Sequence, residues 1–168
     1  KSKYKSSKGK MRNYREIIER LTLETDEYLK LKWAFMGGFT HANAFYTNKV
    51  LNDVYSMDFT SSYPAVMLAE KFPMGKGFKP TKEEILKNGY DYYLNNFHCL
   101  IGISFAGLKN IFHHDSYLSE SKCKIKGERL INNGRIYNAD YVSTIITDVD
   151  LWVIKRCYDY DNITIHDL

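Results

Sequence analysis

The pair Asn133-Gly134 constrains the fold of this chain more than any other feature, because it separates two runs suited to β-strands, Glu128–Ile131 and Arg135–Ile146. Asn-Gly between such runs is typical of a two-residue hairpin, whose turn residues need positive φ angles. A hairpin alone is too small to bury a hydrophobic core. We therefore expect this hairpin to pack on another part of the chain or on a partner.

Helices are predicted before and after the hairpin from apolar residues at helical spacing and from capping signals. They are expected over Tyr14–Leu21, over Asp26–Phe35, over a short stretch that follows Thr81, and from Asp148 onward. Each of the last two begins with a capping box, in which a threonine side chain and an acidic side chain three positions later each accept the other residue's backbone N–H. With a further strand predicted over Phe97–Phe105, the fold class is α+β.

Asp58 ends an apolar, β-prone run, Val54–Met57, which predicts a buried strand with the carboxylate at its carboxyl end. A helix is predicted to follow, capped by Ser61 or Ser62, with Pro64 in its first turn and its apolar side chains packed back on the sheet. A carboxylate fixed in this way suits nucleotidyl transfer, which is catalysed by two divalent ions held beneath a triphosphate. The helix N-terminus would offer backbone N–H groups to the same triphosphate. The alternative is a solvated carboxylate at a strand end.

The segment Asp58-Phe59-Thr60-Ser61-Ser62-Tyr63-Pro64 resembles motif A of the family B DNA polymerases, D-x-x-S-L-Y-P, except that Ser62 stands where the family usually has leucine. The wider run from Gly37 to Pro73 is similar to the protein-primed phage branch of that family. The resemblance implies that Asp58 is a catalytic residue and a ligand of Mg²⁺, or of Mn²⁺, in the complete enzyme. It also implies that the incoming nucleotide is bound by Phe59, Ser61, Ser62 and Tyr63.

Tyr63 has a separate role in this resemblance. In the family, the tyrosine packs under the sugar of the incoming nucleotide and leaves no room for a 2′-hydroxyl. The resemblance therefore implies that Tyr63 is a steric gate, which selects deoxyribonucleotides by shape. From the residues alone, the alternative is an ordinary core tyrosine.

The stretch Phe35-Met36-Gly37-Gly38 resembles the Y-x-G-G element of the protein-primed polymerases, with Phe35 in place of the tyrosine. That element contacts single-stranded template between the exonuclease and polymerase modules, so the resemblance implies DNA binding by Phe35, Gly37 and Gly38. Paired glycines permit positive φ angles and close approach to a phosphate or a base, and a phenylalanine still stacks on bases. Alternatively, the glycines form only the C-cap of the preceding helix.

Asp148-Val149-Asp150 has the spacing of a metal-binding pair, which in the family belongs to a Y-x-D-T-D-S turn between two strands. Here an apolar run follows, so Thr147 and Asp150 are interpreted as a helix capping box. Neither that turn motif nor the family's K-x-x-x-N-S-x-Y-G element is found in the sequence. We expect the chain alone to be inactive, because the single carboxylate of motif A does not hold two ions against their mutual repulsion.

The basic residues are concentrated at the start of the chain. Seven lysines and arginines lie before Glu16, whereas the whole chain has a net charge of +4, so residues 16–168 carry a net −3. We expect the basic tail to be flexible and either to follow a phosphate backbone or to serve as a solvated linker. The three cysteines form no C-x-x-C pair and predict free, reduced thiols. No apolar run is long enough for a membrane span.

The resemblance divides the chain into five segments: a basic flexible tail over 1–15, a helical segment with the Gly-Gly element over 16–50, a polymerase palm segment with motif A over 51–80, an insertion similar to terminal protein region 1 over 81–147, and a return toward the palm over 148–168. The expected structure is thus a partial palm, with a strand and a helix around motif A, and a small inserted α+β subdomain that contains the hairpin. In the family, this insertion contacts duplex DNA and the terminal protein, whose hydroxyl primes synthesis.

Motif A lies far from the N-terminus in the family, so we expect a piece of a longer replicative DNA-directed DNA polymerase. The expected partners are primer-template DNA, deoxynucleoside triphosphates and a terminal protein, in the cytoplasm of a bacterial host of a phage or prophage. The alternative function is that of a non-catalytic α+β module that binds DNA or protein and has motif A by chance.

Overall fold

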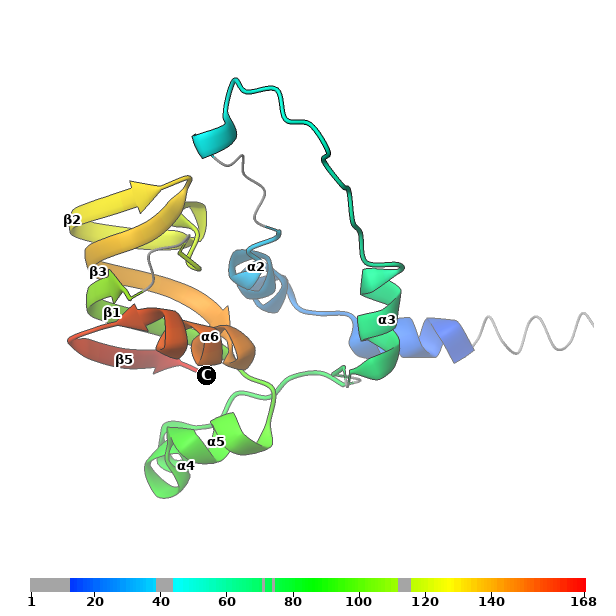
Figure 1. The fold of residues 1–168 in the computed structure, drawn as a ribbon. Helices are drawn as coiled ribbons and strands as arrows, with labels where there is room; N and C mark the ends of the chain where they lie inside the picture. The colour runs from blue at the N-terminus through cyan, green and yellow to red at the C-terminus, as the bar shows by residue number, and fades with distance from the viewer. Residues whose placement is uncertain (1–12, 39–43, 71, 74, 112–115) are drawn as a thin grey trace, which may run out of the picture.

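The computed structural model describes residues 13–38, 44–70, 72–73, 75–111 and 116–168. Its centre is a five-stranded antiparallel sheet with helices on both sides (Figure 1). The strands are β1 Leu100–Asn110, β2 Cys123–Asn132, β3 Arg135–Thr147, β4 Tyr158–Asp159 and β5 Asn162–Asp167. β3 lies between β2 and β1, and the other edge of β1 pairs with β4 and then β5. The α+β class predicted from the sequence is confirmed.

The hairpin predicted at Asn133-Gly134 joins β2 to β3. Both turn residues have positive φ, 48° for Asn133 and 70° for Gly134, and Asn132 pairs with Arg135 across the turn. Asparagine and glycine adopt these angles at little cost, which is why the pair selects this turn. The hairpin packs on β1 of the same chain, and β1 pairs with β3 from Leu100 to Lys109.

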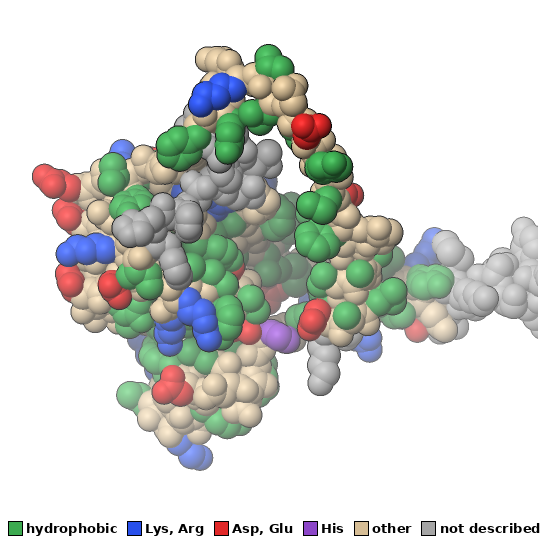
Figure 2. Space-filling view, in the orientation of Figure 1, with side chains coloured by type: hydrophobic (Ala, Val, Ile, Leu, Met, Phe, Trp, Pro, Cys, Tyr) green, Lys and Arg blue, Asp and Glu red, His purple; other side chains and the backbone are tan. Residues whose placement is uncertain are grey.

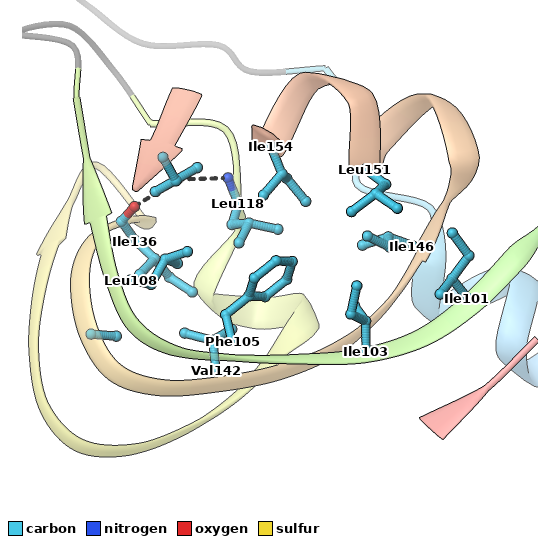
Figure 3. Packing of buried hydrophobic residues seen from close by; sticks show 12 residues of the cluster. Ile101, Ile103, Phe105, Leu108, Leu118, Ile136, Val142, Ile146, Leu151 and Ile154 are labelled. Carbon is cyan, nitrogen blue, oxygen red and sulfur yellow. Dashed lines mark hydrogen bonds between the residues drawn. The ribbon is translucent and has the colours of Figure 1, made fainter. Parts of the chain in front are cut away.

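One face of the sheet forms the hydrophobic core. Ile101, Ile103 and Phe105 alternate along β1 with no exposed surface, and α6, Asp148–Cys157, covers them with Leu151 and Ile154 (Figure 3). Successive side chains of a strand point to opposite faces, so this alternation places one face of β1 in the core. The predicted capping box begins α6, with the Thr147 side chain accepting the backbone N–H of Asp150 at 3.1 Å.

A buried tyrosine completes the core on the side of β4. The hydroxyl of Tyr158 donates to the carbonyl of Ile136 at 2.7 Å and accepts the backbone N–H of Leu118 at 3.1 Å. Burial raises the pKa of Tyr158 to about 12, so the hydroxyl keeps its proton at neutral pH. Because a buried polar group is stable only when it is hydrogen-bonded, these two bonds allow the ring to lie in the core.

The opposite face of the sheet is covered in part by α2, Thr25–Ala34. Strand pairing places Gly102, Ser104 and Ser143 on this face, since they alternate with the core residues. Trp33 of α2 borders a hollow on this face that Gly102 and Ser143 help to line. The sheet is therefore a layer between α6 and α2.

The remaining helical elements lie outside these layers. Residues 13–21 are helical, and the other elements are η1 Ala44–Tyr46, α3 Ser62–Ala69, α4 Lys82–Asn88, α5 Tyr90–Asn96 and η2 Glu120–Lys122. The capping box predicted at Thr81 and Glu84 is present at the start of α4. The strand predicted over Phe97–Phe105 begins later, at Leu100, because Phe97 is the C-cap of α5. It also continues farther, to Asn110. The sequence interpretation missed α5, β4 and β5.

The strand predicted over Val54–Met57 is not formed, and this expectation was wrong for the chain as described. Residues 54–59 have no regular secondary structure, and every residue from 45 to 70 is exposed. A strand needs neighbouring strands to pair its backbone N–H and C=O groups and to cover one of its faces. The described part of the chain supplies no such neighbour to this segment.

Candidate functional site

The segment Asp58–Pro64 lies on the outside of the molecule, at the start of α3. Asp58 is exposed, and the side chains of Phe59 and Tyr63 are 84% and 83% exposed. Among the described residues, no hydrogen bond or ion pair engages the Asp58 carboxylate. The structure thus leaves the acidic and aromatic side chains of this segment free to contact other molecules.

The helix predicted after Asp58 is present, but its cap and its packing differ from the prediction. Ser61 occupies the N-cap position in the left-handed region, with φ 51°, and its side chain makes no capping hydrogen bond. Pro64 lies in the first turn, where its missing N–H costs nothing. The apolar side chains of α3 do not pack on the sheet, as Leu68 is 89% exposed. Figure 2 shows hydrophobic side chains gathered along α3 and the segment before it.

The Phe35-Met36-Gly37-Gly38 stretch follows α2 directly. Helix α2 ends at Ala34, and Phe35 takes the C-cap position with its backbone N–H donating to Leu31. The glycines are therefore not the C-cap, which was the alternative interpretation. Gly37 has φ 65°, an angle that favours glycine, and an added Cβ at Gly38 would meet nothing within 4 Å. The Phe35 ring is exposed beside them, so this stretch presents an aromatic ring and open backbone together.

The acidic residues at the start of α6 are occupied by structural hydrogen bonds. Asp148 accepts the backbone N–H of Cys99 at 3.1 Å and lies 3.2 Å from Nδ1 of His98. Asp150 accepts from Thr147 and from the Tyr117 hydroxyl. The interpretation of Thr147 and Asp150 as a helix cap is confirmed. The described residues contain no group of three metal-ligating side chains.

Asp167 joins three parts of the chain at one carboxylate. Lys30 of α2 and Lys79, which follows α3, both form ion pairs with it. Burial by itself would raise the pKa of Asp167, but the hydrogen bonds and charges of the two lysines outweigh it and lower that pKa. Asp167 also lies against Gly102, where an added Cβ would stand 3.1 Å from the Asp167 Cβ. This junction, which the sequence did not reveal, fixes α2 and the segment after motif A to β5.

A hollow of about 270 Å³ lies between α2 and the sheet. Its lining combines an indole, a lysine, an imidazole and a hydroxyl, and it is formed by Trp33, Gly102, Ile103, Lys124, Ser143, Thr144, Ile145 and His166. His166 is held by a 2.8 Å hydrogen bond between its Nε2 and the Oγ of Ser104. Sequence patterns gave no indication of this hollow, because its residues come from separate elements of the chain.

The cysteines of the chain carry free thiols in the structure. Cys99, Cys123 and Cys157 are free, as predicted. Burial raises the pKa of Cys123 to about 11, so its thiol stays protonated at neutral pH and is a poor nucleophile.

No helix in the described ranges has both the length and the apolar character to cross a bilayer. The basic residues of the tail up to Arg12 lie outside these ranges.

Comparison with known proteins identifies the family of this chain. The profile of the family described as "DNA polymerase type B, organellar and viral" matches residues 2–164. The match includes the Phe35–Gly38 stretch, the segment from Asp58 to Pro64 and the core sheet as far as the first residues of β5. No curated protein and no solved structure matches the chain.

Proposed function

The chain belongs to the organellar and viral type B DNA polymerases, and from this premise we propose that it forms the motif A part of a replicative DNA-directed DNA polymerase. The family match carries the proposal, since it covers nearly the whole chain and includes Asp58–Pro64 in its middle. The reaction is nucleotidyl transfer from a deoxynucleoside triphosphate to a primer on template DNA. Priming by a terminal protein, in a phage or prophage, is part of the proposal and rests on the likeness of Gly37–Pro73 to the protein-primed branch.

Asp58 is proposed as the catalytic carboxylate and as one ligand of the divalent ions. An ionised carboxylate offers only acceptor oxygens, and exposure with no competing partner among the described residues leaves both oxygens of Asp58 available. The described residues contain no cluster of three or more metal-ligating side chains around it. Because one carboxylate does not hold two divalent ions, Mg²⁺ or Mn²⁺, against their mutual repulsion, at least one further ligand must come from outside these residues. We therefore propose that the chain alone is inactive.

The incoming nucleotide is proposed to meet Phe59, Ser61, Ser62 and Tyr63. All four lie within one turn of the start of α3, where the first backbone N–H groups have no partner within the helix. These groups and the serine hydroxyls are donors that suit a triphosphate. The exposed ring of Tyr63 is proposed to exclude the 2′-hydroxyl of a ribonucleotide, as a steric gate.

The exposed apolar side chains around Asp58 support the view that this segment packs on other parts of a polymerase. Met57 and Leu68 are 92% and 89% exposed, and a solvated apolar side chain forfeits roughly 1.5–3 kcal/mol of burial free energy. A palm sheet that paired with residues 54–57 would bury such side chains and hold Asp58 rigidly. Phe35, Gly37 and Gly38 are proposed to contact the template strand.

The unit over residues 81–147 is proposed as a docking surface for terminal protein or DNA, and residues 148–168 as the return toward the palm. In the structure these residues share one sheet with β5 and one core with α6. A second candidate function is that of a non-catalytic binding module. It is favoured by the closed core, which stabilises the sheet without any contribution from motif A.

The test of the proposed function is Asp58→Asn in the complete polymerase that contains this chain. The variant keeps the shape of the side chain but removes its charge, so primer extension should be abolished while DNA binding is retained. Asp53→Asn is the matched control, since Asp53 is exposed in the same segment with φ 55°, an angle that asparagine accepts. Normal synthesis by Asp58→Asn, or loss of DNA binding, would contradict the catalytic role.

Tyr63→Val tests the steric gate in the same polymerase. Removal of the ring opens space at the 2′ position, so the ratio of kcat/KM for a ribonucleotide to that for a deoxynucleotide with the same base should rise. Tyr55→Val, which removes an equally exposed ring outside the motif, is the control. An unchanged ratio would exclude Tyr63 as the gate.

Shortening the hairpin between Ile131 and Arg135 tests the docking role. Residues 132–134 of the turn are exposed, and an added Cβ at Gly134 would meet nothing within 4 Å, so the turn itself makes no core contact. Initiation on terminal protein should fall more than extension of an ordinary DNA primer. An equal loss in both assays would mean that the hairpin only supports the fold.

A further inference from the structure

We propose that the face of the sheet beneath α2 binds a single strand of nucleic acid, with one unpaired base against Trp33 in the hollow and the phosphates along the lysines of β2. This inference rests on the proposed polymerase function, which brings unpaired template strand to the molecule. It assigns a site to residues outside motif A and outside the Phe35–Gly38 stretch.

The hollow has the chemistry of a site for one nucleotide unit. Its volume of about 270 Å³ is just below that of drug-sized ligand sites, roughly 300–1,000 Å³, as suits a single nucleotide unit. An indole wall from Trp33 offers a surface on which any base can stack. The Oγ of Ser143 offers a hydrogen bond to a base edge. The Nδ1 of His166 offers another, because the bond that holds this imidazole to the buried Ser104 uses its Nε2.

A row of lysines leads along β2 to the same hollow. Lys124 and Lys126 occupy alternate positions of β2, so their side chains project from one face of the strand about 6.8 Å apart, twice the rise per residue. Lys122, the last residue of η2, directly precedes the strand. Strand pairing places this face opposite the core, because Lys124 is level with Ser143 and Lys126 with Tyr141. The Nζ of Lys126 lies 5.5 Å from the centre of the Tyr141 ring. Lys124 lines the hollow together with Trp33, and Lys126 lies next to it along the strand beside Tyr141.

The charge of this surface fits phosphates. No carboxylate lines the hollow among the described residues, and the nearest acidic residue of β5, Asp167, is already paired with Lys30 and Lys79. Lys122 donates to the carbonyl of Lys32 at the end of α2, which leaves Lys124 and Lys126 for the ligand. This local positive charge contrasts with the net −3 of residues 16–168.

Lysines on an edge strand also have a structural explanation, since they prevent a second strand from pairing with that edge. Edge protection requires only charge. It does not account for the half-buried Trp33, or for His166 hydrogen-bonded to Ser104, near the same lysines. A single strand fits better than a duplex, because a paired base is not free to reach the indole. The geometry therefore commits to unpaired nucleic acid.

Trp33 itself is the reporter for the test. The chain has two tryptophans, and Trp152 lies on α6, on the core side of the sheet, where it stacks with Arg156 at 3.4 Å. In a Trp152→Phe variant of this chain, all indole fluorescence comes from Trp33. Titration with a single-stranded oligodeoxythymidylate should quench this fluorescence, and the same oligonucleotide annealed to its complement should quench it far less. No quenching, or equal quenching by the duplex, would overturn the proposal.

Affinity variants separate stacking from charge. Measured by anisotropy of a labelled oligonucleotide, Trp33→Ala should weaken binding about tenfold, since removal of one stacking platform has roughly this effect. Lys124→Gln with Lys126→Gln should lower the slope of log affinity against log salt by about 0.7 for each phosphate that a lysine no longer neutralises. Lys82→Gln with Lys87→Gln, both on α4, is the control and should leave the slope unchanged. An equal change in the two lysine pairs would show a general charge effect and contradict the site.

Two further measurements keep these outcomes distinct. Circular dichroism and the unfolding midpoint show whether each variant is folded, and Trp33→Phe replaces Trp33→Ala if the latter unfolds. Asp58→Asn in this chain should not change oligonucleotide affinity. If the oligonucleotide does not quench Trp33 fluorescence while Asp58→Asn still abolishes synthesis in the polymerase, the proposed binding site in the hollow is refuted and the proposed function stands. Quenching by a protein partner but not by oligonucleotide would also refute it.

Discussion

The core sheet and the motif A segment of this chain are both rich in apolar side chains. The sheet buries them, whereas the motif A segment exposes them. Phe105 in β1 has no exposed surface, whereas Phe59, in the segment next to α3, is 84% exposed. Figure 2 shows the second region as an arm of hydrophobic side chains beside the sheet. The difference teaches that an apolar sequence specifies burial only where the chain also supplies the surface that covers it.

The source of the difference is the number of partners each region has within the chain. Every central strand of the sheet has a neighbour, and α6 closes the core over β1 and β3 (Figure 3). The motif A segment has no strand neighbour among the described residues. We therefore expect the sheet to fold independently of motif A, whereas motif A takes its working shape only in the complete polymerase.

The largest expected contrast is between two phenylalanines. Phe105→Ala removes a fully buried ring and should lower the free energy of unfolding by about 3–5 kcal/mol. Phe59→Ala removes an exposed ring and should change it by less than about 0.5 kcal/mol. Both values come from denaturant unfolding of the chain, followed by circular dichroism. A cost for Phe59→Ala close to that of Phe105→Ala would show that motif A is packed in solution, and would break the comparison.

A smaller contrast is expected between two glycines. Gly127 in β2 has φ 78°, and an added Cβ would stand 2.8 Å from the Cβ of Asp140. Asp140 also accepts the backbone N–H of Glu128 at 2.8 Å, so its side chain cannot move away freely. Gly127→Ala should therefore lower the free energy of unfolding by about 1–3 kcal/mol.

Gly75, beyond α3, is the matched control for Gly127. Nothing lies within 4 Å of an added Cβ there, and its φ is not in the left-handed region. Gly75→Ala should be neutral or stabilise by up to about 1 kcal/mol, because alanine restricts the unfolded chain. Equal destabilisation by the two substitutions would mean that the segment after motif A is as tightly packed as the sheet.

The smallest effect is expected at Asp167, which links the two regions. Its folded-state pKa lies below the ordinary value of 3.8, so its ion pairs with Lys30 and Lys79 contribute stability above that value. The contribution is lost as the pH falls through the lower, folded-state pKa. Asp167→Asn should lower the free energy of unfolding at pH 7 by about 1 kcal/mol or less, since both lysines are partly solvated.

The pH dependence sharpens this prediction. The difference between Asp167→Asn and the unmodified chain should be constant from about pH 5 to pH 7 and should shrink below about pH 4. Asp159→Asn, at an exposed position of β4, is the control. A difference that does not shrink in acid would show that Asp167 acts through packing against Gly102 and not through charge.

The elements that sequence patterns predicted correctly are those decided by a few neighbouring residues. The turn at Asn133-Gly134 needs two residues with positive φ, and each capping box needs two side chains three positions apart. The strand over Val54–Met57 failed because strand formation depends on a pairing partner distant in sequence. The helix α5 was missed because an aromatic run, Tyr90–Tyr93, lacks a clear apolar stripe. The roles of Asp58 and Tyr63 stay predictions.

The sequence by itself determined the family, the hairpin and the caps of α4 and α6, because each of these is encoded in a short stretch of the chain. Only the tertiary structure decided that α2 lies over the sheet, that Asp167 holds both Lys30 and Lys79, and that Trp33 and Lys124 line one hollow. These contacts join residues far apart in the chain, and their free energy depends on packing and on charges that meet only after folding. A local pattern contains no information on which distant surfaces will meet.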